Sequence, residues 1–382
     1  MPVRHAAIVG AGIAGLTAAL ALAKRGISSD IFEQADVLAE AGAGLQISPN
    51  AARILGELGV LADIEKVWLE PQSIRLVSGH TLRPLASVPA GDFARSRWGA
   101  PYGVLHRATL QKVLIAAVTA NPLCTLRLGS GIEPGAIPQT GRKPEVIVGA
   151  DGVWSKLRQA IEASPSPRFS GHIAYRFTIA GSSAPAFLDR SSVSAFLSSS
   201  AHLVCYPLKE TANFNLVAIT AGNAAPQDWR NEPTDQQSKQ LRSRLSGWHP
   251  DIKSLLGDVQ MTFWPLYETT AGRWQNGKDT VLIGDAAHAM MPFAAQGAAM
   301  AMEDAYELAA LLAAHEPAEA LARFERQRAP RIAQVRKRGA FNRFAYHASG
   351  PIRLGRDLVL SLKPPQSLAA DLDWIYGYRP IG

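Results

Sequence analysis

The chain has 382 residues, 47% hydrophobic and 19% charged, so it can bury a sizeable core and extended disorder is excluded. Its two cysteines, Cys124 and Cys205, stand far apart, which excludes a disulfide framework or a thiolate zinc site and leads us to expect no bound metal. No apolar run reaches the roughly 18 residues of a membrane-spanning helix, and residues 1–10 look like a buried strand rather than a cleavable signal. We therefore expect a cytoplasmic protein with no membrane partner.

Positive charge is concentrated late in the chain. The 39 Lys and Arg residues outnumber the 32 Asp and Glu residues, and residues 323–343 hold eight basic residues against the single acid Glu325. Such a stretch can bind nucleic acid, but no known binding module accompanies it. We therefore expect a solvated helix face, no nucleic-acid partner and, at most, attraction of small anionic substrates.

The predicted elements begin with a β-α-β unit. Residues 6–10 form a short apolar run that predicts a buried parallel strand, and residues 13–25 carry apolar side chains at helical spacing. Residues 28–33 predict a second strand that ends in an acid. Further elements are two helices and one strand, predicted over 50–58, 107–120 and 145–149.

The pattern changes after about residue 170. Alternating apolar and polar residues then predict antiparallel strands over 172–179, 201–207 and 215–220. A buried-strand pattern returns late in the chain and is followed by two long helices, predicted over 280–284, 296–314 and 318–338.

The order of these elements predicts two domains, one of them discontinuous. We expect residues 1–169 and 266–345 to form a nucleotide-binding domain and residues 170–265 to form a sheet domain for the substrate. Residues 346–382 are expected to form a C-terminal tail. The sheet domain would then roof a cleft over the bound nucleotide.

A glycine-rich turn, Gly10-Ala11-Gly12-Ile13-Ala14-Gly15, lies between the first strand and the first helix. Gly10 permits the tight turn, Gly12 lets the backbone approach a pyrophosphate, and Gly15 lets the helix pack on the strand. The helix N-terminus offers free N–H groups to the phosphates, and Glu33 is placed to accept the hydroxyls of an adenosine ribose. This pattern predicts a dinucleotide site but does not choose between NAD and FAD. No tyrosine is followed four residues later by the lysine of a short-chain dehydrogenase.

Four further motifs follow, of which two are longer. Residues 149–158 (GADGVWSKLR) contain DGxxSxxR, and residues 284–288 (GDAAH) precede Pro292 and Gln296-Gly297. The other two are His106-Arg107 and residues 42–46 (GAGLQ). Together they resemble the motifs of the single-component FAD-dependent aromatic hydroxylases, in their salicylate hydroxylase-like and 6-hydroxynicotinate 3-monooxygenase-like branch. Residues 373–378 (DWIYGY) are similar to a tail seen in that branch.

The resemblance implies an α/β fold in which a Rossmann-like FAD-binding domain of the glutathione reductase type carries an inserted antiparallel-sheet substrate domain and C-terminal helices. It implies bound FAD, with Asp285 on the ribityl hydroxyls, Arg107 between the two ends of the cofactor, and the helix start at Gly297 stabilising negative charge on the flavin ring. The expected FAD-binding residues are Gly10, Gly12, Ile13, Ala14, Gly15, Glu33, Gln34, Arg107, Asp151, Gly284, Asp285, Pro292, Gly297 and Ala298.

Two candidate catalytic residues, His202 and Tyr206, lie on the strand predicted over 201–207. Period-two alternation puts them on one face, about 13 Å apart along the strand. A lone histidine on a strand is more often structural, but in the resembling enzymes these positions line the substrate pocket and help to deprotonate a ring hydroxyl. Arg176 is a further candidate, for a carboxylate or phosphate. The expected substrate-binding residues are Gln46, Arg176, His202, Tyr206 and Pro292.

The activity that the resemblance implies is hydroxylation of an aromatic or N-heteroaromatic ring, as in a salicylate- or hydroxypyridine-carboxylate-like acid. NADH or NADPH and O₂ would be consumed, through a flavin C4a-hydroperoxide. One alternative is a flavoprotein reductase or dehydrogenase of related fold that inserts no oxygen. Another is a non-enzymatic protein that carries flavin or contacts nucleic acid through residues 323–343. By family analogy we expect a monomer or homodimer.

Overall fold

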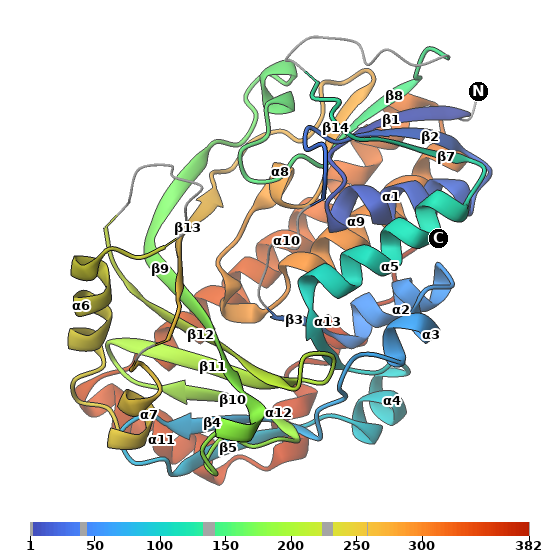
Figure 1. The fold of residues 1–382 in the computed structure, drawn as a ribbon. Helices are drawn as coiled ribbons and strands as arrows, with labels where there is room; N and C mark the ends of the chain where they lie inside the picture. The colour runs from blue at the N-terminus through green and yellow to red at the C-terminus, as the bar shows by residue number, and fades with distance from the viewer. Residues whose placement is uncertain (1–2, 39–43, 133–141, 224–231, 258, 382) are drawn as a thin grey trace.

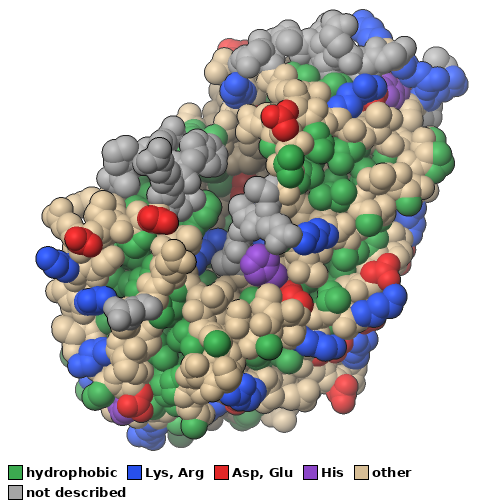
Figure 2. Space-filling view, viewed as in Figure 1, with side chains coloured by type: hydrophobic (Ala, Val, Ile, Leu, Met, Phe, Trp, Pro, Cys, Tyr) green, Lys and Arg blue, Asp and Glu red, His purple; other side chains and the backbone are tan. Residues whose placement is uncertain are grey.

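The computed structural model describes residues 3–38, 44–132, 142–223, 232–257 and 259–381. Two sheets dominate it, and the long helices α9 (Gly297–Ala314) and α10 (Pro317–Tyr346) run through the centre of the molecule (Figure 1). Figure 2 shows one face hollowed between the part that contains the first sheet and the part that contains the second.

The first sheet has five strands, all parallel to their neighbours. Short apolar runs form it because helices cover the faces of a parallel sheet and bury its strands from both sides. Pairing aligns Val9 with Phe32 and Gly149, and Gly149 with Leu282, so four strands end at one edge. The order is β14 (Thr280–Leu282), β8 (Val146–Gly149), β1 (His5–Val9), β2 (Ser28–Phe32) and β7 (Cys124–Arg127).

Helices α1 (Ile13–Ala23) and α5 (Arg107–Ala120) pack beside this sheet together with α9. Nearly every residue of α1 is buried, which explains its lack of a polar face. The smaller helices of this part are α2 (Pro49–Glu57), α3 (Leu61–Glu65), α4 (Asp92–Trp98) and α8 (Asp285–His288), and a two-stranded ribbon joins β3 (Gly44–Ile47) to β6 (Gly103–His106).

The second sheet has seven strands, antiparallel except where β10 and β4 run parallel. Two of its strands come from residues 73–89, inside the range that we assigned to the nucleotide-binding domain. The domain boundaries themselves stay a prediction. The order is β13 (Thr262–Thr269), β9 (Pro167–Ala180), β12 (Asn213–Ala221), β11 (Ala201–Leu208), β10 (Ser192–Leu197), β4 (Ser73–Ser78) and β5 (Pro84–Pro89).

Two sets of helices pack against this sheet. The outer side of β9 and β11 packs against α6 (Asp235–Arg244) and α7 (Pro250–Ser254), through residues such as Tyr175, Leu203 and Trp248. The predicted tail is helical, with α11 (Gly350–Leu362), α12 (Pro365–Ala370) and α13 (Asp373–Tyr376), and its first two helices pack against β5. Within the described ranges, no helix is both long and apolar enough to cross a bilayer. The predicted α/β fold class is confirmed.

Candidate active site

The glycine-rich turn forms an open cradle at the end of β1. Gly10 has φ +103°, and a Cβ there would lie 2.5 Å from the carbonyl oxygen of Ala150. A Cβ on Gly15 would lie 1.9 Å from the oxygen of Gly10, so helix and strand touch at this point. Apart from its chain neighbours and its own helix, Gly12 has no described atom within 4 Å of its Cβ position, and no described side chain caps the helix that starts there. The cradle therefore has room and free N–H donors for a pyrophosphate.

Glu33 lies directly beside this cradle. Its Oε2 accepts a hydrogen bond from the backbone N–H of Ala11 at 2.9 Å, and its Oε1 accepts one from Ala35 at 3.0 Å. Gln34 follows it and is exposed. The second strand thus delivers the acid to the edge of the cradle, where the ribose of a dinucleotide would follow its phosphates.

Asp285 is presented to solvent by a tightly held loop after β14. Gly284 has φ +58° and donates its N–H to buried Asp304 at 2.9 Å. Arg158 donates to the backbone oxygens of Asp285 and Ala286 at 2.9 and 2.8 Å. Burial lowers the pKa of Arg158, against the charges of the nearby carboxylates. The Asp285 carboxylate itself is exposed and has no hydrogen bond to the described residues, which leaves it free for a ligand.

The two other predicted FAD contacts on this side differ in their surroundings. Asp151 follows β8, and its Oδ2 accepts backbone N–H groups of Lys156 and Leu157 at 2.9 and 3.3 Å. Its Oδ1 is buried without a hydrogen-bond partner. Arg107 begins α5 and is exposed. An orphaned acceptor beside Gly10 and an exposed cation at the start of α5 both fit a polar cofactor.

The start of α9 is also open. Pro292 begins a short 3-10 turn, and Gln296 then leads into Gly297 and Ala298, which are only partly buried. Among the residues that the structure describes, no side chain caps this 18-residue helix, and only chain neighbours and the helix itself lie within 4 Å of a Cβ placed on Gly297. Its N-terminus can therefore stabilise negative charge on a bound ring. Gln296 is held away from this opening by hydrogen bonds to Ser48 and Asn50.

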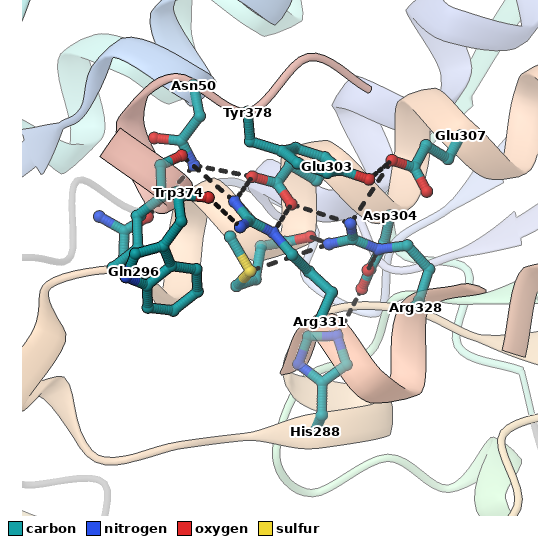
Figure 3. Close-up of polar contacts among 12 residues, drawn as sticks. Asn50, His288, Gln296, Glu303, Asp304, Glu307, Arg328, Arg331, Trp374 and Tyr378 are labelled. Atoms are coloured by element: carbon teal, nitrogen blue, oxygen red, sulfur yellow. Dashed lines mark hydrogen bonds and ion pairs between the residues drawn. The ribbon is translucent and has the colours of Figure 1, made fainter. Parts of the chain in front are cut away.

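A buried ionic network lies beneath these loops (Figure 3). Arg328 is fully buried and contacts Glu303 and Asp304, each at 2.8 Å, while Arg331 contacts Glu303 at 2.9 Å. His288 lies 2.5 Å from Asp304. Burial would raise the pKa of Asp304, but His288 and Arg328 together lower it below its usual value. The prediction that residues 323–343 form a solvated basic face is therefore wrong for Arg328 and Arg331, which turn inward to acids on α9.

The same network holds the C-terminal segment against the cofactor-binding part. Arg331 donates to the backbone oxygens of Trp374 and Ile375 at 2.6 and 3.2 Å, and its guanidinium lies 3.9 Å from the centre of the Tyr378 ring. Asn50 links Glu303 to Gln296 at the start of α9. Residues 374–378 are thus joined through polar contacts to the loop that we expect beside the flavin ring.

The predicted catalytic pair lies on the inner face of the second sheet. Leu203 and Cys205 pack into the core on the outer face, so His202 and Tyr206 share the opposite one. His202 is 2% exposed, and its ring centre lies 5.1 Å from that of Phe293, which follows Pro292. The loop beside α9 and the substrate sheet therefore meet at His202.

Tyr206 lies at the other end of this face. A Cβ on Gly44 would lie 2.6 Å from its ring, so β3 crosses closely over β11. Gln46, on β3, accepts a hydrogen bond from Tyr102 at 2.5 Å. Burial raises the pKa of Tyr206 and nearby Arg176 opposes the rise, so its hydroxyl stays protonated near neutral pH. Residues 42 and 43 of the motif over 42–46 lie outside the described residues.

Arg176 is a part-buried cation that has no counter-ion among the described residues. Its Nε is buried and has no hydrogen-bond partner, and its guanidinium lies 5.4 Å from the centre of the Trp264 ring. Burial lowers its pKa, the Tyr206 hydroxyl opposes the change, and Arg107 adds to it. No described carboxylate pairs with Arg176. Because burying an unpaired cation is costly, this position is suited to an anionic ligand.

Sequence reasoning missed four residues of this face. His347 and Tyr346, at the end of α10, contact His202, and His172 on β9 stacks on His347 with ring centres 6.1 Å apart. Phe293 packs against all three histidines. No motif marks them, because they come from separate elements that only the fold brings together. In the described part of the chain, no three His, Cys, Asp or Glu side chains are grouped to hold a metal ion.

Comparison with known proteins agrees with this geometry. Residues 4–339 match the family described as FAD binding domain, and the chain belongs to that family. A 3-amino-4-hydroxybenzoate 2-monooxygenase from Streptomyces platensis is 34% identical over 98% of this chain and 97% of its own. The 3-hydroxybenzoate 6-hydroxylase 1 of Aquipseudomonas alcaligenes is 33% identical over 98% of each chain. A salicylate hydroxylase solved with its substrate has a TM-score of 0.79 at 22% identity, over 99% of this chain and 96% of that one.

These matches confirm the predicted family and the predicted type of enzyme, an FAD-dependent monooxygenase of aromatic rings. The open cradle at Gly12, the free Asp285 carboxylate and the uncapped start of α9 fit FAD. The roles of the individual site residues stay predictions.

Proposed function

We propose that the enzyme hydroxylates an aromatic acid that carries both a ring hydroxyl and a carboxylate, with NADH or NADPH as the reductant. The observation that carries this proposal is Arg176, a part-buried cation with no counter-ion in the described parts of the chain, on the sheet face that also holds His202 and Tyr206. The relatives act on hydroxybenzoates, which have both groups.

Different residues of the chain would hold different parts of the cofactor. The cradle at Gly12 would hold the pyrophosphate, Glu33 the ribose, and Asp285 the ribityl hydroxyls. When bound, FAD supplies the electron transfer and O₂ activation that ring hydroxylation requires. Pro292 and Phe293 lie between the two sides, where they would exclude water from the reacting groups.

On the substrate side, Arg176 would hold the carboxylate and set the position of the ring. His202 would take the proton of the ring hydroxyl, which raises the electron density of the ring toward an electrophilic oxygen. Burial and the neighbouring histidines hold the pKa of His202 well below its ordinary value, so the ring is neutral at neutral pH and one of its nitrogens carries a free lone pair. Tyr206 and Gln46 would line the opposite end of the pocket.

The test is turnover with a panel of acids and their matched phenols. Oxidation of NADH and NADPH is followed with 3-hydroxybenzoate, 3-amino-4-hydroxybenzoate and salicylate, and the product is analysed after reaction under ¹⁸O₂. We expect an acid-dependent rate and one ¹⁸O atom in the product. A product without ¹⁸O would show a reductase or dehydrogenase instead.

Arg176→Gln tests the carboxylate contact. We expect at least a tenfold rise in KM for the acids, since a charged hydrogen-bonding partner is lost, and less than a twofold change for phenols without a carboxylate. Arg168→Gln is the matched control, because Arg168 lies on the same strand but is exposed and paired with Glu268. Equal effects on acids and phenols would contradict the role of Arg176.

We propose a monomer or homodimer whose ligands are small molecules, and light scattering of the holoenzyme measures its mass directly. A larger assembly would contradict it.

A further inference from the structure

His202 shares a hydrogen bond with a second histidine from a distant part of the chain. Its Nδ1 lies 3.0 Å from Nε2 of His347, the residue that follows α10. The two ring centres are 5.2 Å apart, and Phe293 and Tyr346 enclose His202 at 5.1 and 5.4 Å. The rings of Phe293 and Tyr346 therefore pack around His202, and the imidazole of His347 is its hydrogen-bond partner.

This contact determines which nitrogen of His202 can act on a ligand. Nδ1 is engaged by His347, whereas Nε2 has no hydrogen bond to the described residues. A neutral imidazole carries one N–H and one free lone pair. If the Nδ1–H of His202 donates to Nε2 of His347, the lone pair on Nε2 of His202 is the one that faces a ligand.

The two histidines differ in their contact with solvent. His202 is 2% exposed, so a proton that it accepts cannot leave directly to bulk water. His347 is only partly buried, and its Nδ1 has no hydrogen bond to the described residues. The pair therefore connects a buried base to the surface through one hydrogen bond.

We infer that His347 is the positioning residue and the proton exit of His202, an inference that rests on the proposed role of His202 as the base. The O–H bond of the substrate's ring hydroxyl breaks as a bond from that proton to Nε2 of His202 forms. The Nδ1–H bond of His202 then breaks as an N–H bond forms on Nε2 of His347. His347 releases its Nδ1 proton to water, so one proton leaves the pocket and no electrons are transferred.

The electrostatics of the cluster favour passage of the proton over its retention. Burial, then His172 and Arg343, lower the pKa of His347 to about 4. Burial and the two other histidines hold the pKa of His202 well below its ordinary value. At neutral pH both rings therefore return to the neutral state after transfer. The titratable and charged groups on the elements packed around the pair are His172 on β9, Glu268 on β13, Arg343 and Tyr346 on α10, and Arg356 on α11.

Neighbouring His172 provides a matched control. It belongs to the same cluster, but its Nδ1 contacts the carbonyl oxygen of Ser170 at 3.0 Å and it has no hydrogen bond to His202. A residue that acts only through packing or charge would behave like His172, whereas a proton exit must behave like His347.

The experiment measures proton release when ligand binds to the oxidised holoenzyme, before any turnover. Stopped-flow mixing with 3-hydroxybenzoate or 3-amino-4-hydroxybenzoate in weak buffer with a pH indicator gives the rate. His347→Gln keeps an oxygen that can accept the hydrogen bond but cannot carry the proton. We expect release at least tenfold slower in His347→Gln and within twofold of wild type in His172→Gln, with unchanged FAD content and ligand Kd. ¹⁵N spectra of the wild-type histidines should show His202 as the Nδ1–H tautomer.

The outcomes separate this inference from the proposal beneath it. If His202→Gln slows release but His347→Gln does not, His202 remains the base and the role of His347 is overturned. An Nε2–H tautomer of His202 would also overturn it. Three other outcomes would contradict the proposed function of the site itself. They are that neither acid binds, that wild type releases no proton, or that His202→Gln releases it normally.

Discussion

Two glycines of the phosphate cradle, only three residues apart, should respond to the same substitution in opposite ways. A methyl group on Gly15 would lie 1.9 Å from the carbonyl oxygen of Gly10 and 3.2 Å from a methyl of Ile8, so α1 must move away from β1. At Gly12, φ is −74° and the Cβ position is open. Gly15→Ala therefore perturbs the fold, whereas Gly12→Ala perturbs the ligand.

The expected magnitudes follow from these contacts. Because the 1.9 Å contact is with backbone, overpacking should cost the upper part of its usual range, about 2–3 kcal/mol, and alanine recovers about 1 kcal/mol of helix propensity. Gly15→Ala should therefore lose about 1–2 kcal/mol of unfolding free energy. Gly12→Ala should change it by less than about 0.5 kcal/mol. In the cradle, however, its methyl group occupies the space where the backbone approaches the phosphates. A tenfold loss of FAD affinity, about 1.4 kcal/mol, is the smallest effect that we expect.

Urea unfolding of the apoprotein measures the first quantity, and titration with FAD by fluorescence quenching measures the second. Wild-type FAD affinity in Gly12→Ala would refute the placement of the phosphates at this turn. An apoprotein of Gly15→Ala as stable as wild type would refute the close contact of α1 with β1.

Three further predictions concern the ion pairs, the histidines and the flavin contact. Glu303→Gln removes the acid partner of buried Arg331 and one of the acid partners of Arg328, which keeps Asp304, and should cost about 3–5 kcal/mol in urea unfolding. Asp63→Asn at an exposed pair should cost less than about 0.5 kcal/mol, and similar costs for the two variants would show that the network contributes little. The pKa of His347 is lowered to about 4 in the folded protein, so the unfolded chain takes up this proton at a higher pH than the folded chain does. The free energy of unfolding should therefore fall as the pH drops from about 6.5 to 4, by at most about 1.4 kcal/mol per pH unit. In His347→Gln that fall should be shallower, and an unchanged curve would contradict the assignment. Asp285→Asn should weaken FAD binding about tenfold without changing apoprotein stability, because its carboxylate has no hydrogen bond to the described residues; unchanged binding would place the ribityl chain elsewhere.

The glycine turn and the acids at the strand ends could be predicted because their signals are local, whereas their contacts with FAD stay predictions. Gly10 and Gly284 adopt positive φ, which glycine tolerates, and Gly15 sits where any Cβ would collide with backbone. Such residues are visible in one short stretch of sequence. The acids Glu33 and Asp285 follow strands, and parallel strands deliver their carboxyl ends to one edge of the sheet.

The substrate side could be predicted only in part. Period-two alternation placed His202 and Tyr206 on one face, which the packing of Leu203 and Cys205 on the other face confirms. The same reasoning gave no partner for His202, because His347 is 145 residues away and its own surroundings look like an ordinary helix end.

The basic stretch shows the limit of composition. Residues 323–343 look like a solvated face when counted as charges, yet Arg328 is fully buried among acids of α9. A charge count does not reveal which side chains the neighbouring helix places opposite each arginine. Burial of an arginine depends on acidic side chains at those positions.

By itself, the sequence determined the glycine cradle, the acids at the strand ends and the family, since each depends on residues close together in the chain. Tertiary structure alone decided that strands from residues 73–89 join the second sheet, that Arg176 has no described counter-ion, and that His347 meets His202. The physical reason is that contacts between distant segments arise from the joint packing of several elements, and no single segment encodes them.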